Sequence, residues 1–209
     1  MKRTFFSLAL LLAVATLTAQ TKMTAREAAV KIADRILAST TYEFKNTKTG
    51  EIYKSVKKLP LDMDVKVACK YNNWHYTNGV TNMALMELGD KLGDKKYEKY
   101  VLKNMNFVFN EGNLDFFRKQ YDEAFKRDGW NAVRKLSWHM IFRGKRLDDN
   151  GPMGASLIEL QLKYPNDSFL GYINETAEHL NYGEPRLVDG TIARIWPHVN
   201  TIRADDAFM

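Results

Sequence analysis

The sequence predicts an all-α protein whose helices are paired as α/α hairpins. Apolar residues recur at helical spacing in about seven segments, which is the pattern of amphipathic helices. The connections between these segments alternate between short and long, as they do in helical arrays. No segment carries a run long enough to indicate a β-sheet, and no strict repeat consensus is present. We therefore expect either a solenoid or a closed toroid.

The N-terminal part of the array is predicted to contain two helices separated by irregular backbone. Thr24 to Glu27 form a capping box, so the first helix is expected from about Ala25 to Ser39. The segment from Tyr42 to Val67 holds two turn signals and is expected to be irregular. The second helix follows from Val80 to Leu92.

Turn and capping residues divide the middle of the chain into three further helices. Gly93 and Asp94 end the second helix, and Asp94 is expected to cap the third, which ends near Gly112. Asn113 is expected to cap the fourth helix. Asp128-Gly129 separates it from the fifth.

The last two helices are expected after a polar loop from Arg143 to Gly151. Pro152 is predicted to begin the sixth helix, because proline suits the first helical turn. Tyr164-Pro165 ends it, and Asn166 or Asp167 caps the seventh.

Residues 1–20 have the pattern of a secretory signal peptide. Lys2 and Arg3 precede an apolar run that is too short for a membrane span, and the segment ends in small residues. No cysteine stands near the cut, so a lipoprotein anchor is disfavoured. We expect residues 21–209 to form the mature domain, exported to the periplasm or secreted.

Charge and cysteine content exclude several classes of function. The formal net charge is +6, and about +4 remains without Lys2 and Arg3. This charge is too small to indicate nucleic-acid binding but is compatible with an anionic substrate. Cys69 is the only cysteine, so an intrachain disulfide is impossible and a small core residue is expected. Motifs with metal-ligand spacing are absent from the sequence.

Polar and aromatic residues concentrate at three predicted junctions between a loop and a helix. The junctions are 74–79, 146–151 and 190–206. Two of them contain adjacent carboxylates, Asp148-Asp149 and Asp205-Asp206. Every second junction of an α/α array falls on the same face, where helix dipoles favour negative charge. Two carboxylates in one cavity suit acid/base catalysis; the alternative is that both pairs are ordinary N-caps.

Other residues of these junctions are candidates for binding a substrate. Arg194 and His198 could hold an anionic group, although surface polarity explains them equally well. Trp74 and Tyr76 could stack on a sugar ring, with core packing as the alternative. The remaining tryptophans, Trp130, Trp138 and Trp196, are assigned to core or loop packing.

Three segments resemble, in order, motifs of the unsaturated glucuronyl and rhamnogalacturonyl hydrolases, which are glycoside hydrolase families 88 and 105. They are the first motif (Trp74–Val80), the second motif (Arg146–Gly151) and the third motif (Thr201–Met209). The resemblance implies an (α/α)6 barrel, a toroid of six helical hairpins. The chain supplies about seven helices, so we expect it to hold the N-terminal part of that domain, truncated after the third motif.

The resemblance also implies an activity that needs no metal or cofactor. Family members remove an unsaturated uronic acid from the non-reducing end of oligosaccharides left by polysaccharide lyases. Asp205 matches the proton donor, Asp149 matches the second acidic residue, and Asp148 flanks it. Two residues depart from the family pattern. Arg203 stands where many members have tryptophan, and Arg194 stands where some have histidine.

The first motif matches the part of the family's site that contacts the substrate. Tyr76 falls in it, with Trp74 and Asn78 beside it. The expected partner is therefore an unsaturated uronyl oligosaccharide of the pectin or rhamnogalacturonan type. Two alternatives stay open: a truncated, inactive sugar-binding remnant, and an epimerase or lyase built on another (α/α) toroid.

Overall fold

The computed structural model describes residues 23–143, 147–194 and 201–202. The chain divides after Arg35 into two units, and each is considered by itself. The first unit contains most of helix α2 (Ala25–Ser39), whose bounds are those predicted. The predicted capping box is confirmed: the Thr24 N–H donates to the Glu27 carboxylate at 2.8 Å, and the Glu27 N–H donates to the Thr24 hydroxyl at 3.2 Å.

The second unit is mostly helical, and with α2 the described residues contain seven helices, the number predicted. Its helices are α3 (Tyr76–Leu92), α4 (Lys96–Val108), α5 (Glu111–Val133), α6 (His139–Arg143), α7 (Leu147–Lys163) and α8 (Asp167–Glu178). Three shorter helical turns accompany them: η1 (Val56–Lys58), η2 (Lys70–Asn72) and the π-helical turn η3 (His179–Gly183).

The prediction that the chain has no sheet is wrong. Strands β1 (Phe44–Asn46), β2 (Ile52–Tyr53) and β3 (Val65–Val67) form a three-stranded antiparallel sheet in the order β2-β1-β3. Each strand is two or three residues long, too short for the alternation that marks a strand in sequence. The sheet depends on a distant pairing, since Phe44 lies opposite Val67.

Most predicted helix ends are confirmed. Gly93 takes a left-handed conformation with φ of 66° and ends α3, as a residue without a Cβ does readily. The Asp94 carboxylate accepts a 3.0 Å hydrogen bond from the Lys96 N–H at the start of α4. Asp128 and Gly129 have non-helical backbone angles and break α5. Asn166 caps α8 by accepting from the Ser168 N–H at 2.9 Å.

Three predicted helix starts and one predicted end are wrong. Helix α3 begins at Tyr76 and not at Val80, and α4 ends at Val108, before Gly112. Asn110 caps α5 instead of Asn113, which lies inside the first turn.

Helix α7 begins at Leu147, so residues 147–151 are helical and Pro152 lies inside the helix. Asparagine, glycine and proline all disfavour a helix interior, which is why the sequence indicated a loop. Packing against α3 outweighs those local preferences.

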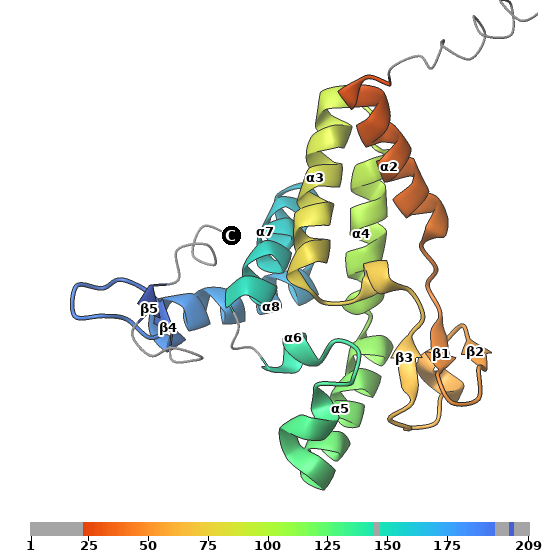
Figure 1. The fold of residues 1–209 in the computed structure, drawn as a ribbon, viewed down its shortest axis with the longest axis vertical. Coiled ribbons are helices and arrows are strands. Elements are labelled where there is room, and N and C mark those ends of the chain that lie inside the picture. The colour runs from red at the N-terminus through yellow and green to blue at the C-terminus, as the bar shows by residue number, and fades with distance from the viewer. Residues whose placement is uncertain (1–22, 144–146, 195–200, 203–209) are drawn as a thin grey trace, which may run out of the picture. The chain divides into compact units, whose positions relative to one another are not determined.

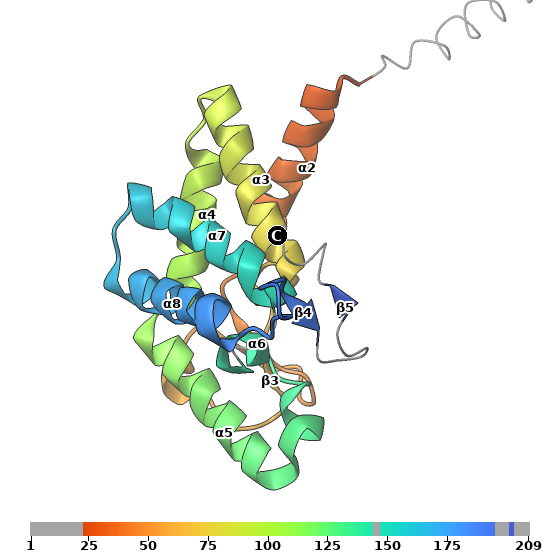
Figure 2. The ribbon, with the colours of Figure 1, turned by 90° about the vertical axis from the view of Figure 1, so that its left-hand side faces the viewer.

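Helices α3 and α7 pack side by side and run in the same direction (Figures 1 and 2). Trp74, just before α3, contacts Asn150 near the start of α7. Asp90, near the end of α3, lies 3.4 Å from the Lys163 ammonium at the end of α7. Helix α4 packs on α3, and α8 packs on α7. Two hairpins, separated in the chain by α5 and α6, therefore place their first helices next to each other.

The core is rich in aromatic side chains that form two groups. The first holds Trp74, Phe109, Phe169 and Tyr172, with ring centroids 4.9–5.8 Å apart. The second surrounds the fully buried Trp138 and contains Phe44, Phe107 and Phe117. Cys69 is buried, as predicted.

Candidate active site

The first motif forms the start of α3. His75 caps the helix, because its Nδ1 accepts from the Thr77 N–H at 3.4 Å. The ring of Tyr76 is exposed and lies 4.6 Å from the His75 imidazole. Asn78 is buried, and its side-chain amide donates to the carbonyls of Lys70 and Asn73 at 2.9 and 2.6 Å. Tyr76 thus faces outward, while Asn78 fixes the preceding turn to the helix.

Trp74 occupies the interior instead of the surface. Its side chain is only 1% exposed, with Phe109 and Tyr172 packed edge-on against its rings. The indole N–H donates to Asn150 Oδ1 at 3.4 Å. Core packing, the alternative considered for this residue, therefore describes its surroundings, and no face of its ring is open to a sugar here.

Residues 147–151 of the second motif form the first turn and a half of α7, and Arg146 lies outside the described residues. Asp148 is half-buried, and Asp149 belongs to the helix, but its side chain lies outside the described part. The next residue, Asn150, is buried. Its Oδ1 accepts from both the Trp74 indole and the Tyr172 hydroxyl, the latter at 2.6 Å. Asn150 thereby joins α7 to the turn before α3 and to α8.

Close packing of the helices brings the first two motifs together. Gly79 faces α7, and a Cβ at this position would stand 2.6 Å from the Met153 nitrogen and closer still to the Pro152 backbone. Only glycine permits this approach. The N-terminal ends of two parallel helices therefore lie side by side, and their helix dipoles make this end favourable for negative charge.

The third motif lies almost entirely outside the described residues. Asp205, His198 and Arg203 belong to this undescribed part. Strand β4 (Ala193–Arg194) pairs antiparallel with β5 (Thr201–Ile202). The backbone of Arg194 therefore lies opposite that of Thr201, where the third motif begins. The side chain of Arg194 is not among those described.

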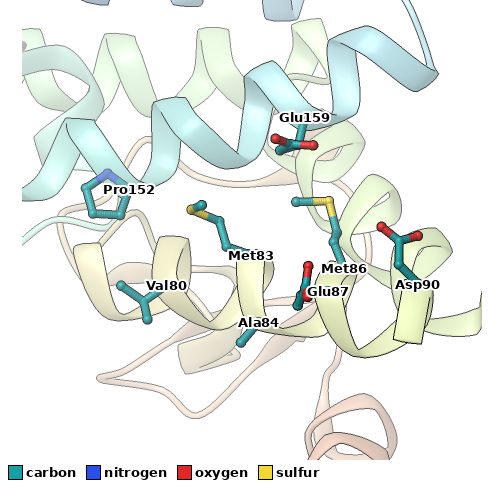
Figure 3. A pocket seen from close by; sticks show the side chains of 8 residues that line it. All are labelled: Val80, Met83, Ala84, Met86, Glu87, Asp90, Pro152 and Glu159. Atoms are coloured by element: carbon teal, nitrogen blue, oxygen red, sulfur yellow. The ribbon is translucent and has the colours of Figure 1, made fainter. Parts of the chain in front are cut away.

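A groove of about 550 Å³ runs between α3 and α7 (Figure 3). Val80 and Pro152 line one end of it, and the side chains of Met83 and Met86 reach from α3 toward α7. The other end carries three carboxylates, contributed by Glu87, Asp90 and Glu159. An apolar groove with an acidic end repels a uronate. The groove is therefore a poor match for the expected substrate, and the motif end of the helices suits it better.

An ion-paired cluster ties together the far ends of these helices. The Lys163 ammonium lies 2.6 Å from Glu98 Oε2, and the Tyr164 hydroxyl donates to Glu98 Oε1 at 2.6 Å. These hydrogen bonds, that from Lys163 first, lower the pKa of Glu98 below its ordinary value. The bond to Glu98 likewise raises the pKa of Lys163. The cluster links α4 to α7 and stabilises the hairpin pair.

Three residues that shape this region escaped the sequence prediction. Asn150 and Tyr172 form the hydrogen-bonded centre, and Gly79 sets the helix separation. The packing role of Gly79 could have been inferred from the sequence, because a glycine within a helical segment commonly marks close packing. Asn150 stands directly after the acidic pair, but its placement in an expected loop concealed its packing role.

In the part of the chain that the structure describes, no group of three or more histidine, cysteine, aspartate or glutamate side chains could hold a metal ion. Within the same residues, none of the helices combines the length and the hydropathy needed to cross a membrane.

Comparison with known proteins gives this chain no family. No family model matches it, and no curated protein is detectably similar.

Proposed function

We propose that the chain belongs to an (α/α)6 glycoside hydrolase that removes unsaturated uronic acid from the non-reducing end of lyase-generated oligosaccharides. The proposal begins with the resemblance of three motifs to glycoside hydrolase families 88 and 105. Pectin and rhamnogalacturonan fragments are the expected substrates. The expected place of action is outside the cytoplasm, because residues 1–20 have the pattern of a signal peptide.

The main structural observation in support of this proposal is that Asn150 of the second motif accepts a hydrogen bond from Trp74 of the first motif. The two motifs are separated by more than seventy residues, yet they lie at the same end of two parallel helices. Side-by-side first helices of two hairpins are also a feature of α/α toroids, where such helices line the interior; here α5 and α6 lie between the two hairpins in the chain. The backbone of the acidic pair belongs to the first turn of α7, at the end where we propose that a substrate binds.

The proposed reaction is a hydration and not a displacement at the anomeric carbon. Asp205 donates a proton to C4 of the C4=C5 enol ether, and Asp149 holds a water molecule and accepts its proton as the oxygen bonds to C5. The resulting hemiketal opens and releases the remaining sugar chain. General acid/base catalysis of this kind contributes about 10²–10⁴-fold to a rate. The step leaves Asp205 ionised and Asp149 protonated. A proton must pass from Asp149 back to Asp205 before the next turnover.

Substrate contacts are assigned to residues around the same end. Tyr76 is exposed beside the start of α3 and offers its ring to the sugar face. Arg194 and His198 would bind the uronate carboxylate, where arginine provides a planar pair of donors. Asp148 is assigned to a sugar hydroxyl. Trp74 and Asn78 do not contact the substrate in this proposal. They hold the first motif in place, through the hydrogen bonds to Asn150 and to the Lys70 carbonyl.

The test is the loss of ultraviolet absorbance when the unsaturated uronide is consumed. The full chain is mixed with lyase-generated pectin and rhamnogalacturonan oligosaccharides. We expect bleaching by the unmodified chain, and at least 100-fold slower bleaching by Asp205→Asn and by Asp149→Asn. Asp189→Asn, which changes an exposed carboxylate, is the matched control and should leave the rate unchanged.

Three other outcomes would contradict the proposal or part of it. Unchanged bleaching by Asp205→Asn removes that residue from the mechanism. If the unmodified chain binds the oligosaccharides without bleaching them, it is a sugar-binding remnant. If it neither binds nor bleaches them, the proposed substrate class is wrong.

A further inference from the structure

A cluster of aromatic rings and arginines lies on α5 and α6, which pack against each other. We call it the α5–α6 aromatic face; its members are Arg118, Tyr121, Phe125, Trp130, Phe142 and Arg143. Tyr121 stacks nearly parallel to Phe125 with 6.3 Å between centroids, and Phe125 meets Trp130 edge-on at 5.5 Å. The rings thus form a continuous surface along one helix.

Two rings of this face are unusually exposed for their size, while Tyr121 and Phe142 are partly buried. Trp130 is 50% exposed and Phe125 is 45% exposed. The break at Asp128 and Gly129 turns the last part of α5 and carries Trp130 with it. A contiguous exposed aromatic surface is characteristic of a binding site. Core or loop packing, the role expected for Trp130, therefore accounts for only half of its side chain.

Two arginines lie against the rings of this face. The Arg143 guanidinium lies 4.9 Å from the Trp130 ring centre, and that of Arg118 lies 4.9 Å from the Phe142 ring centre. A guanidinium stacked on a ring keeps its N–H groups in its own plane, where they can bind a carboxylate with two hydrogen bonds. Each arginine is therefore positioned beside an apolar ring with donors to offer.

The surrounding segment concentrates positive charge. Between Arg118 and Arg143 the chain has seven basic and three acidic residues, a net charge of +4 out of +6 for the whole protein. The first turns of α5 add Glu111 and Asp115, so α5, α6 and the turn between them carry a net charge of +2 overall. Such a field attracts an anionic partner.

We propose that the α5–α6 aromatic face binds an anionic polysaccharide chain that carries uronate groups. Aromatic rings pack against the C–H face of a sugar, and the adjacent guanidinium groups bind the carboxylates. A protein partner would also use tryptophan and arginine, but the excess of positive charge favours a polyanion with repeated carboxylates. Arg118 and Phe142 also line a hollow with Tyr172, so this end of the face adjoins the motif end of α7; the proposal does not depend on the proposed hydrolysis.

The test is affinity electrophoresis of the full chain in gels containing polygalacturonate, with dextran gels as the neutral reference. We expect the unmodified chain to be retarded by polygalacturonate and not by dextran. Trp130→Ala and Arg143→Gln should each raise the apparent dissociation constant at least fivefold. Thermal unfolding of each variant verifies that it is folded, since a half-exposed tryptophan contributes little to the core.

Two matched controls isolate the face from general effects. Tyr182→Ala removes an aromatic ring that is 86% exposed and lies outside the face. Lys45→Gln removes one exposed positive charge on β1, the same change in net charge as Arg143→Gln. Both controls should retain the unmodified chain's affinity for polygalacturonate.

Three results would overturn the proposal. The first is equal weakening by Lys45→Gln and Arg143→Gln, which indicates only nonspecific charge attraction. The second is unchanged retardation of Trp130→Ala. The third is no retardation of the unmodified chain, combined with self-association in sedimentation velocity that Trp130→Ala abolishes, which makes the face a protein interface.

Discussion

Trp74 and Trp130 occupy opposite kinds of surroundings in the same domain. Trp74 is 1% exposed, surrounded by aromatic rings and hydrogen-bonded to Asn150. Trp130 is 50% exposed and stacked with Arg143. The first fixes the geometry of the motif end, and the second has the exposure and the charge that a binding surface needs.

The difference in exposure separates a tryptophan that stabilises the structure around a site from one whose ring is accessible to a ligand. A buried ring with its N–H satisfied makes the positions of its neighbours rigid. A ring at the surface adds little to stability and is available for binding. The motif end and the α5–α6 aromatic face should therefore respond to substitution in opposite ways, the first in stability and the second in affinity.

The largest expected effect is that of Trp74→Ala. The substitution removes a fully packed indole and the donor to Asn150, and we expect a loss of about 4 kcal/mol in the free energy of unfolding. Urea denaturation measures it. Trp130→Ala is the matched control and should cost less than about 1 kcal/mol, because surface substitutions have small effects. Equal losses for the two variants would contradict the comparison.

Gly79→Ala tests the close packing of α3 against α7. The added methyl group would collide with backbone atoms at Pro152 and Met153, which cannot move aside as a side chain can. We expect a loss of about 3 kcal/mol, at the upper end for overpacking, measured by thermal unfolding.

Gly171→Ala in α8 is the control for Gly79→Ala. A Cβ at Gly171 has open space around it, and alanine favours helix by about 1 kcal/mol. This variant should therefore be at least as stable as the unmodified chain. A Gly79→Ala protein that kept full stability would show that the two helices are not held at this distance.

Asn150→Ala should cost about 2 kcal/mol. It removes the acceptor that the Trp74 indole and the Tyr172 hydroxyl share, and losing a partner for a buried donor carries a desolvation penalty. Urea denaturation of Asn150→Ala, Tyr172→Phe and the double variant gives the coupling. We expect the double variant to lose at least 0.5 kcal/mol less than the sum of the two single losses; strictly additive losses would exclude the shared bond.

The smallest expected effect is that of Glu98→Gln, and it depends on pH. Hydrogen bonds from Lys163 and Tyr164 lower the pKa of Glu98 below 4.5. A lowered folded-state pKa means that the contribution to stability is present above pH 4.5 and is lost as the pH falls through the folded-state pKa. We expect Glu98→Gln to lose about 1 kcal/mol at pH 7, since Lys163 is partly exposed and screened.

Urea midpoints at pH 7 and pH 3 measure this dependence. The difference between the unmodified chain and Glu98→Gln should shrink toward zero at the lower pH. Glu123→Gln, which removes the carboxylate of an exposed pair with Lys126, is the control and should change stability little at either pH. A difference that persisted at pH 3 would show that the Glu98 charge is not what stabilises the helices.

Local chemistry near each helix end was enough to predict most of the helices. Thr24 and Glu27 cap α2, Gly93 ends α3, and Asn166 caps α8, because each acts on backbone groups within a few residues. The sheet and the start of α7 could not be predicted this way. Phe44 pairs with Val67, and Asn150 bonds with Trp74, so both features depend on contacts between distant segments.

The same distinction between local sequence features and contacts between distant segments applies to the candidate site. Its motifs and their acidic residues were proposed from the sequence, and the contact between the segments of the first two motifs could be seen only in the structure. The separation of Asp149 from Asp205 remains a prediction, because Asp205 lies outside the described residues. Which aromatic residues are open to a ligand also depended on packing: Trp74 is enclosed, while Tyr76, two residues on, is exposed.

The sequence by itself determined the number of helices, most of their ends and the chemical character of the motifs, because spacing and capping act over short distances. Only the tertiary structure decided that Trp74 is buried, that Trp130 is exposed, and that Trp138 holds a positive φ of 56°. A bulky residue avoids that conformation on its own. Trp138 keeps it because its ring is fully buried and its N–H donates to the Asn72 carbonyl at 2.7 Å, and contacts of this kind exist only once distant parts of the chain have met.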